Sequence, residues 1–192
     1  MNNKLLNDGF QGDKYRICNN WFDFIPITDE PIKYLEIGLF NGANIISVAN
    51  SYGIHSDSKL YGIDPYIDYD EYDEYKKIQD NNYENFKYNL KNNNVENKTI
   101  HLRDFSNQAL KKFDNSMFDI IYIDGNHETK YVLEDAVLSF NLLKINGYMI
   151  FDDYQTGLVE TTKGIDSFLN CYEGYFKLLG VKENQLFIQK IK

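Results

Sequence analysis

Short apolar runs alternate with longer amphipathic stretches along most of the chain. The short runs are rich in isoleucine, leucine and aromatic residues and end in glycine or aspartate, which is typical of buried strands. The longer stretches carry apolar residues on one side, which is typical of helices packed on a sheet. The expected strands are 34–37, 59–64, 99–103, 118–124 and 148–151, and the expected helices are 43–52, 74–92, 129–145 and 165–171. This alternation predicts an α/β fold with a mostly parallel sheet.

The two ends of the chain differ from this alternation. Two apolar runs, 175–181 and 185–191, predict a closing hairpin, which adds at least one antiparallel strand to the sheet. The N-terminal residues are polar and lead into an aromatic cluster around Trp21, so they form either a helix packed on the sheet or a lid over a ligand site. We expect one domain, with 1–32 as an N-terminal helix or lid segment and 33–192 as the cofactor-binding core.

Charge and cysteine content restrict the possible partners. The net charge is −9 and no lysine- or arginine-rich run exists, which disfavours nucleic acid. Cys18 and Cys171 are far apart and lack metal-ligand spacing, so we expect ordinary thiols in a reducing compartment. The N-terminus is too polar for a signal peptide, and no apolar run reaches membrane-spanning length. We therefore expect a cytoplasmic protein without a membrane partner.

The first strand leads through a glycine turn into a helix, with Glu36, Gly38 and Gly42 at the turn. Such turns lie at the carboxyl edge of a parallel sheet, where α/β folds bind ligands. A dinucleotide fingerprint needs glycine where Glu36 stands, and a carboxylate there repels pyrophosphate but suits a cation. The pattern E-x-G-x-x-x-G resembles the first motif of class I methyltransferases dependent on S-adenosylmethionine (SAM). In that family the acid faces the ammonium group of SAM. The alternative is a plain turn with Glu36 on the surface.

The next two strands also end in polar residues. Asp64 follows the second strand, where an acid in nucleoside-binding folds accepts hydrogen bonds from the ribose hydroxyls. The alternative is a strand-end aspartate that starts a turn with Pro65. Asp104 and Ser106 follow the third strand, and the methyltransferase resemblance implies that they read the adenine edge, although Ser106 could instead cap a helix. The acidic, tyrosine-rich stretch 66–75 is either a cover for the adenine or substrate, or a solvated loop.

The resemblance becomes more specific after the fourth and fifth strands. Asp124 begins a D-G-x-H motif that ends in His127, and Asp152 and Asp153 form a paired-acid motif. Both motifs resemble the class I branch that holds the macrocin and mycinamicin sugar O-methyltransferases and the cephalosporin-biosynthesis proteins. The resemblance implies a Rossmann-like, seven-stranded, mostly parallel sheet with a reversed C-terminal strand and helices on both faces. It also implies SAM as cofactor and Mg²⁺ held by Asp124, Asp152 and Asp153, with His127 as the base.

The same residues support this chemistry without the resemblance. Neighbouring strand ends bring the three carboxylates together, and they repel one another unless they are protonated or bridged by a cation. Mg²⁺ takes oxygen ligands and keeps waters that a substrate hydroxyl can replace. In the alternative interpretation Asp152 caps a turn, Asp153 points to solvent and His127 is structural.

The leading hypothesis is therefore a SAM-dependent O-methyltransferase for a small hydroxylated substrate, with sugars among the candidates and Mg²⁺ assisting. Asp124 and His127 are its candidate catalytic residues, and Asp124 also belongs to the expected cofactor site. Two alternatives remain, a nucleotide-dependent oxidoreductase and a SAM- or sugar-binding module without turnover. A homo-oligomer is compatible with the sequence, which does not specify the oligomeric state.

Overall fold

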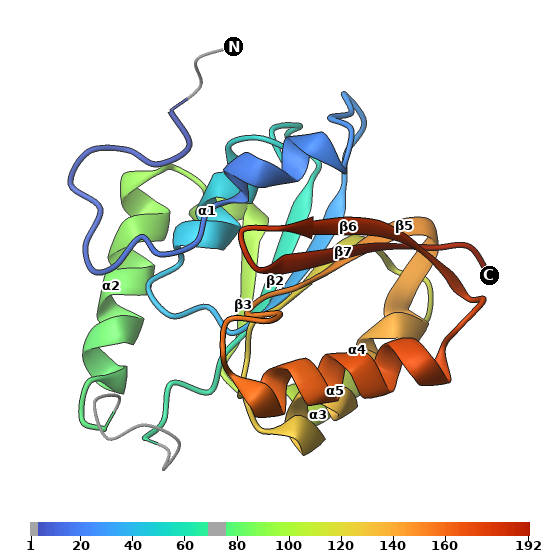
Figure 1. The fold of residues 1–192 in the computed structure, drawn as a ribbon. Coiled ribbons are helices and arrows are strands. Elements are labelled where there is room, and N and C mark those ends of the chain that lie inside the picture. Colours follow the sequence, from blue (N-terminus) through green and yellow to red (C-terminus); the bar gives the residue numbers. More distant parts are fainter. Residues whose placement is uncertain (1–3, 69–75) are drawn as a thin grey trace.

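The computed structural model describes residues 4–68 and 76–192 (Figure 1). One seven-stranded sheet, in the order β3-β2-β1-β4-β5-β7-β6, runs through the molecule. The strands are β1 (Lys33–Ile37), β2 (Lys59–Ile63), β3 (Thr99–Leu102), β4 (Phe118–Ile123), β5 (Leu143–Phe151), β6 (Phe176–Lys182) and β7 (Gln185–Lys190). The first five pair in parallel, and β7 runs antiparallel to both of its neighbours. The predicted fold class is confirmed.

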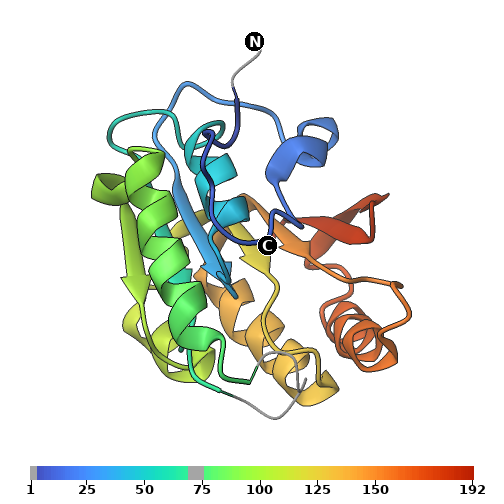
Figure 2. The ribbon, with the colours of Figure 1, turned by 90° about the vertical axis from the view of Figure 1, so that its left-hand side faces the viewer.

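Helices cover both faces of the sheet (Figures 1 and 2). Helices α1 (Ala43–Ala49) and α2 (Gln79–Asn92) lie on one face with the short helix η1 (Cys18–Asp23), where Trp21, Tyr34 and Phe86 belong to one core cluster. Helices α4 (Thr129–Leu142) and α5 (Val159–Cys171) cover the other face, where Ile121 and Phe168 belong to a second cluster. Within residues 4–68 and 76–192 the remaining helices are about one turn long: η3 (Glu96–Lys98), α3 (Ser106–Ala109) and η4 (Leu110–Lys112).

The strand order places a topological switch in the middle of the sheet. Strand β1 pairs with β2 on one side and with β4 on the other, so the chain crosses over in opposite directions from this point. Ligands of open α/β sheets bind beyond the carboxyl ends of the strands at such a switch. The loops that follow β1, β2, β4 and β5 therefore supply the candidate site.

The end of helix α4 differs from the sequence prediction. Helix α4 ends at Leu142 rather than 145, because Leu143 pairs with Phe118 of β4 and starts the fifth strand early. The Lys190 ammonium donates to the carbonyls of Phe140 and Leu143 at 2.8 and 2.9 Å, which satisfies the helix end. Gly147 consequently lies inside β5 and not at the predicted helix cap.

The boundaries of three other helices also differ from the sequence prediction. Helix α1 stops at Ala49, three residues before its predicted end, and α5 starts at Val159 rather than at 165. Helix α2 begins at Gln79, and the first two residues of its predicted range, together with most of the tyrosine-rich stretch, lie outside the described residues. At the closing hairpin, Glu183 and Asn184 have φ angles of 49° and 60°, which suit the tight turn between β6 and β7.

The N-terminal segment packs on the molecule at two places. Asn89 of α2 accepts a hydrogen bond from the backbone of Gln11 and donates one back, at 2.8 Å each. Further along, Trp21 of η1 is fully buried against the rings of Tyr34, Tyr52 and Tyr122. At Trp21 the structure therefore shows a helix packed on the sheet, which is the first of the two alternatives for the aromatic cluster.

No helix in residues 4–68 and 76–192 has both the length and the apolar character needed to cross a membrane.

Candidate functional site

The glycine turn fits the first strand tightly against the loop after β4. Gly38 has a φ angle of +85°, and a Cβ atom added there would lie 1.8 Å from the carbonyl oxygen of Asp124. The space at Gly38 is therefore filled by the backbone of Asp124. Gly42, with φ +82°, precedes α1, and its missing side chain leaves room for the Phe86 ring.

Glu36 lies inside the molecule, not on its surface. Its side chain accepts a hydrogen bond from the Tyr34 hydroxyl at 2.5 Å and one from the Asn44 amide at 3.0 Å. The residue is only 1% exposed, and burial raises the pKa of its carboxyl to about 8. The alternative of a surface glutamate is wrong, and the contact with SAM stays a prediction.

Asp64 organises the glycine turn. Its Oδ2 accepts hydrogen bonds from the backbone N–H groups of Leu39 and Phe40 at 2.9 and 3.1 Å, and its Oδ1 accepts one from Tyr66 at 2.9 Å. The bond from Tyr66 closes a turn after Asp64, as the alternative interpretation of a turn-forming aspartate expected. A carboxylate offers about four acceptor positions, so these three bonds leave the ribose role open as a prediction.

The two candidates for adenine recognition have different surroundings. Asp104 accepts a hydrogen bond from the Lys112 ammonium at 2.7 Å, which lowers the pKa of its carboxyl. Ser106 is the first residue of α3 and bonds to Asp135 of α4, so it does not cap the helix. Asp135 is buried, which raises its pKa to about 7. The sequence analysis missed Asp135, whose signal was an acid on the otherwise apolar side of α4.

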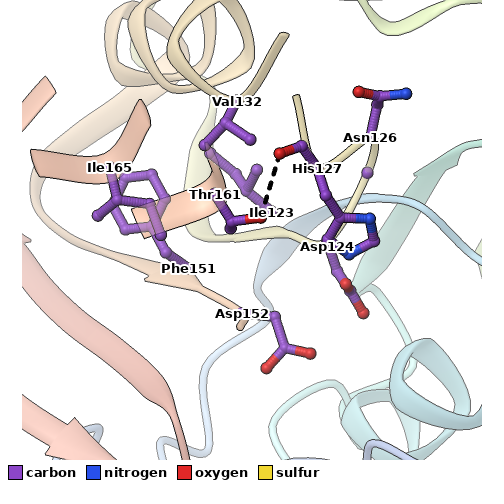
Figure 3. A pocket seen from close by; sticks show the side chains of 10 residues that line it. Ile123, Asp124, Asn126, His127, Val132, Phe151, Asp152, Thr161 and Ile165 are labelled. Carbon is purple, nitrogen blue, oxygen red and sulfur yellow. Dashed lines mark hydrogen bonds between the residues drawn. The ribbon is translucent and has the colours of Figure 1, made fainter. Parts of the chain in front are cut away.

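Three of the predicted side chains converge beyond β4 and β5. One oxygen or nitrogen from each of Asp124, His127 and Asp153 lies within 4.8 Å of the others. The His127 Nε2 is 3.1 Å from Oδ2 of Asp153. The His127 carbonyl accepts a hydrogen bond from Thr161 at 3.2 Å, which is the dashed line in Figure 3. Asp153 has a φ angle of 55°, an unusual conformation that aspartate tolerates better than most residues. The Asp153 contact holds the imidazole ring, and the Thr161 bond holds the backbone that carries it.

Asp152 is bound to an arginine that the sequence analysis did not identify. The Arg16 Nε donates to Oδ2 of Asp152 at 2.7 Å, and its Nη2 donates to Oδ1 of Asp153 at 3.2 Å. Asp152 is 4% exposed, and a carboxylate buried to this degree needs a charge partner. Arg16 thus pairs with both Asp152 and Asp153, and the metal role of Asp124, Asp152 and Asp153 stays a prediction.

Negative charge is concentrated at this site. Burial, followed by the neighbouring Asp152 and Asp153 carboxylates, raises the pKa of Asp124 well above its usual range. Burial also raises the pKa of Asp152, against the opposing charge of Arg16. Burial acts the same way on Asp153, but the hydrogen bonds and charges of His127 and Arg16 outweigh it and lower the pKa. The site therefore favours a bound proton or cation near Asp124.

A small cavity lies behind this group (Figure 3). Its volume is about 10 Å³, and Val132, Phe151 and Ile165 supply apolar walls beside Asp124 and Asp152. That volume is the room of roughly one water molecule, so a nucleoside cannot enter it. A ligand the size of SAM needs the outer side of the strand ends.

Comparison with known proteins identifies the family. Residues 35–154 match the family model described as a methyltransferase domain, which is more than half of the chain. The chain belongs to this methyltransferase family. The matched range includes the glycine turn and the three acids and one histidine of the converging loops, Asp124, Asp152, Asp153 and His127. The prediction of a methyltransferase is confirmed at the level of the family and the fold.

Individual relatives of this methyltransferase domain are distant. The uncharacterized protein R132 of Acanthamoeba polyphaga mimivirus is 28% identical over 136 residues, which are 66% of this chain and 53% of that protein. The chain thus spans about half the length of that relative. The structure of the O-methyltransferase NovP has a TM-score of 0.67 and 14% identity, with 84% of this chain and 73% of that chain covered. The MycE methyltransferase from the mycinamycin biosynthetic pathway, solved with Mg and SAH, has a TM-score of 0.56 and 16% identity, with 85% and 46% covered.

Proposed function

We propose that this methyltransferase domain transfers the methyl group of SAM to a hydroxyl group of a small molecule, and that sugars are the first acceptors to test. The observation that carries the proposal is the convergence of Asp124, His127 and Asp153 beyond the carboxyl ends of β4 and β5. SAM supplies a methyl group on a sulfonium centre, which a hydroxyl oxygen can accept in line. The O-methyltransferase NovP, which shares the fold, supports O-methylation as the reaction class.

We assign cofactor binding to the turns around the topological switch. Glu36, Gly38 and Gly42 form the first turn, and Asp64 holds that turn through two backbone N–H groups. Asp104, Ser106 and Asp124 complete the proposed set on the neighbouring strands. A rigid set of this kind contributes by alignment of the two reactants, which can supply about 7–11 kcal/mol of barrier reduction.

The side chains at the site fit a divalent cation. Asp124 and Asp153 supply carboxylate oxygens, which Mg²⁺ prefers, and one ligand atom of each lies within 4.8 Å of the other. We assign the cation to these two carboxylates, while Asp152 stays with Arg16. When bound, Mg²⁺ would orient the acceptor hydroxyl and lower its pKa.

His127 is the proposed general base. A hydroxyl group is a poor nucleophile at neutral pH, so a basic group must accept its proton as the new bond forms. An imidazole has a suitable unperturbed pKa of about 6.5. The 3.1 Å contact between Nε2 of His127 and Oδ2 of Asp153 holds the ring in place. The imidazole can serve as the base only while Nε2 is not a metal ligand.

Turnover and binding are tested separately. Isothermal titration should show SAM binding to the wild-type protein, and a panel of hydroxylated sugars and phenols should reveal an acceptor. His127→Ala should lower kcat by roughly 10²–10⁴ and leave SAM affinity nearly unchanged. Equal kcat in wild type and His127→Ala would remove His127 from the mechanism.

The panel also decides between the enzyme and a binding module. SAM binding without turnover of any acceptor would favour a SAM-binding module. A nucleotide-dependent oxidoreductase no longer competes, because the chain belongs to the methyltransferase family.

A further inference from the structure

A chain of buried hydrogen bonds connects the N-terminal segment to Asp124. The indole Nε1 of Trp21 donates to Oε1 of Gln185 at 2.9 Å. The Nε2 of Gln185 donates to the Tyr122 hydroxyl at 3.1 Å, and this hydroxyl donates to Oδ2 of Asp124 at 3.4 Å. The four residues come from η1, β7, β4 and the loop after β4, so three distant parts of the chain meet at one carboxylate.

The chemistry of these groups determines which group donates in each hydrogen bond of this series. An indole N–H can only donate, so the oxygen of the Gln185 amide must face Trp21. The amide nitrogen, which can also only donate, then faces Tyr122. Because the Tyr122 oxygen accepts from Gln185, its own proton is free to point at Asp124. The reverse orientation would place two donors against each other.

Burial keeps water from replacing these bonds. Trp21 and Tyr122 are 0% exposed and Gln185 is 1% exposed. A phenol hydroxyl is protonated at neutral pH, so Tyr122 has a proton to donate to Asp124. The ring centres of Trp21 and Tyr122 are 5.3 Å apart, which restricts both side chains further.

We propose that Tyr122 is a positioning residue for Asp124, and that Gln185 and Trp21 hold Tyr122 in the donating orientation. The inference rests on the proposed function, in which Asp124 is a ligand of the divalent cation. A hydrogen bond to Oδ2 favours the charged carboxylate and leaves Oδ1 available to the cation. Removal of such a supporting partner typically lowers metal affinity 10–100-fold.

The test measures binding of Mn²⁺ alone by isothermal titration. Tyr122→Phe keeps the ring and removes the hydroxyl, and it should weaken Mn²⁺ binding 10–100-fold. Tyr52→Phe is the matched control, because Tyr52 is also buried beside Trp21 but donates its hydroxyl to the Ile25 carbonyl, away from the site. The control should bind Mn²⁺ like the wild type. Equal affinity of Tyr122→Phe and Tyr52→Phe would overturn the inference.

Two further measurements cover the other outcomes. If Tyr122→Phe does not fold, Gln185→Leu replaces it, and unchanged Mn²⁺ affinity in that variant would overturn the inference. If the wild type itself does not bind Mn²⁺, the proposed metal site fails. Crystal structures of the wild type and Tyr122→Phe then decide the positioning role, since we expect the Asp124 carboxylate to rotate in the variant. An unchanged carboxylate would refute the role of Tyr122.

Discussion

Replacing Gly38 by alanine tests how closely the first strand is fitted against the loop that carries Asp124. The backbone at Gly38 has a φ angle of +85°, which residues with a side chain rarely adopt. The added methyl carbon would lie 1.8 Å from the Asp124 carbonyl oxygen and 2.6 Å from its carbonyl carbon. Both atoms belong to the backbone, so the loop after β4 must move to admit the methyl group.

The expected loss of stability has two parts. A side chain in the left-handed conformation costs about 1–2 kcal/mol. Forcing an extra methyl group into a filled space costs typically about 1–3 kcal/mol more. Gly157→Ala is the matched control, because Gly157 has a φ angle of +102° but nothing within 4 Å of its added Cβ. The control should therefore lose only the first part.

Urea unfolding without any ligand, followed by circular dichroism, measures both variants. We expect Gly38→Ala to lose about 1–3 kcal/mol more free energy of unfolding than Gly157→Ala, which is the overpacking part alone. Equal losses would refute the reasoning, because they would mean that the space at Gly38 is open. In that case Gly38→Ala should instead impair SAM binding selectively, as expected of a glycine that makes room for a ligand.

Two further predictions concern buried charge. The pKa of Glu36 in the folded protein is about 8, above its ordinary value of 4.5, so the folded form binds the proton more tightly than the unfolded form between these values. The free energy of unfolding of the wild type should therefore fall as the pH rises from about 5 to 8. In Glu36→Gln, urea unfolding at these two pH values should show a smaller fall than in the wild type. An equal fall in the free energy of unfolding in Glu36→Gln and the wild type would contradict the raised pKa of Glu36. Arg16→Met removes the cation beside Asp152 and Asp153, so thermal unfolding should show a protein less stable by about 1–3 kcal/mol, whereas Mn²⁺ affinity should rise. Unchanged or weaker Mn²⁺ binding would argue against competition between Arg16 and the metal.

The sheet and part of the site could be predicted because each depends on local sequence patterns. The apolar run before Asp124 indicates a buried strand, and parallel strands bring their carboxyl ends to one edge of the sheet. That is why Asp124, His127 and Asp153 converge as expected. The helix after His127 was predicted too long, because Leu143 continues the helical pattern while its pairing with Phe118 places it in a strand.

The partners of the acids could not be predicted, because they come from remote parts of the chain. Arg16 lies in a polar N-terminal stretch with no periodicity, and only the folded structure brings it to Asp152. Tyr122 and Gln185 have the pattern of ordinary strand residues, and their bond at 3.1 Å depends on the pairing of three strands. Sequence patterns indicate where a strand ends, whereas the surroundings of each end depend on the whole topology.

The N-terminal segment supplies a positive charge and hydrogen bonds to the acids of the candidate site. The core contributes Asp124, Asp152 and Asp153, which together carry more negative charge than His127 can balance. Arg16 supplies a positive charge to two of these acids, and Trp21 starts the hydrogen-bond chain that reaches the third. Arg16 bridges Asp152 and Asp153 at the side where a cation would share Asp153, so a metal must either share that carboxylate or displace the guanidinium. Because the two cations act on the same charge, the position of Arg16 should depend on whether metal is bound.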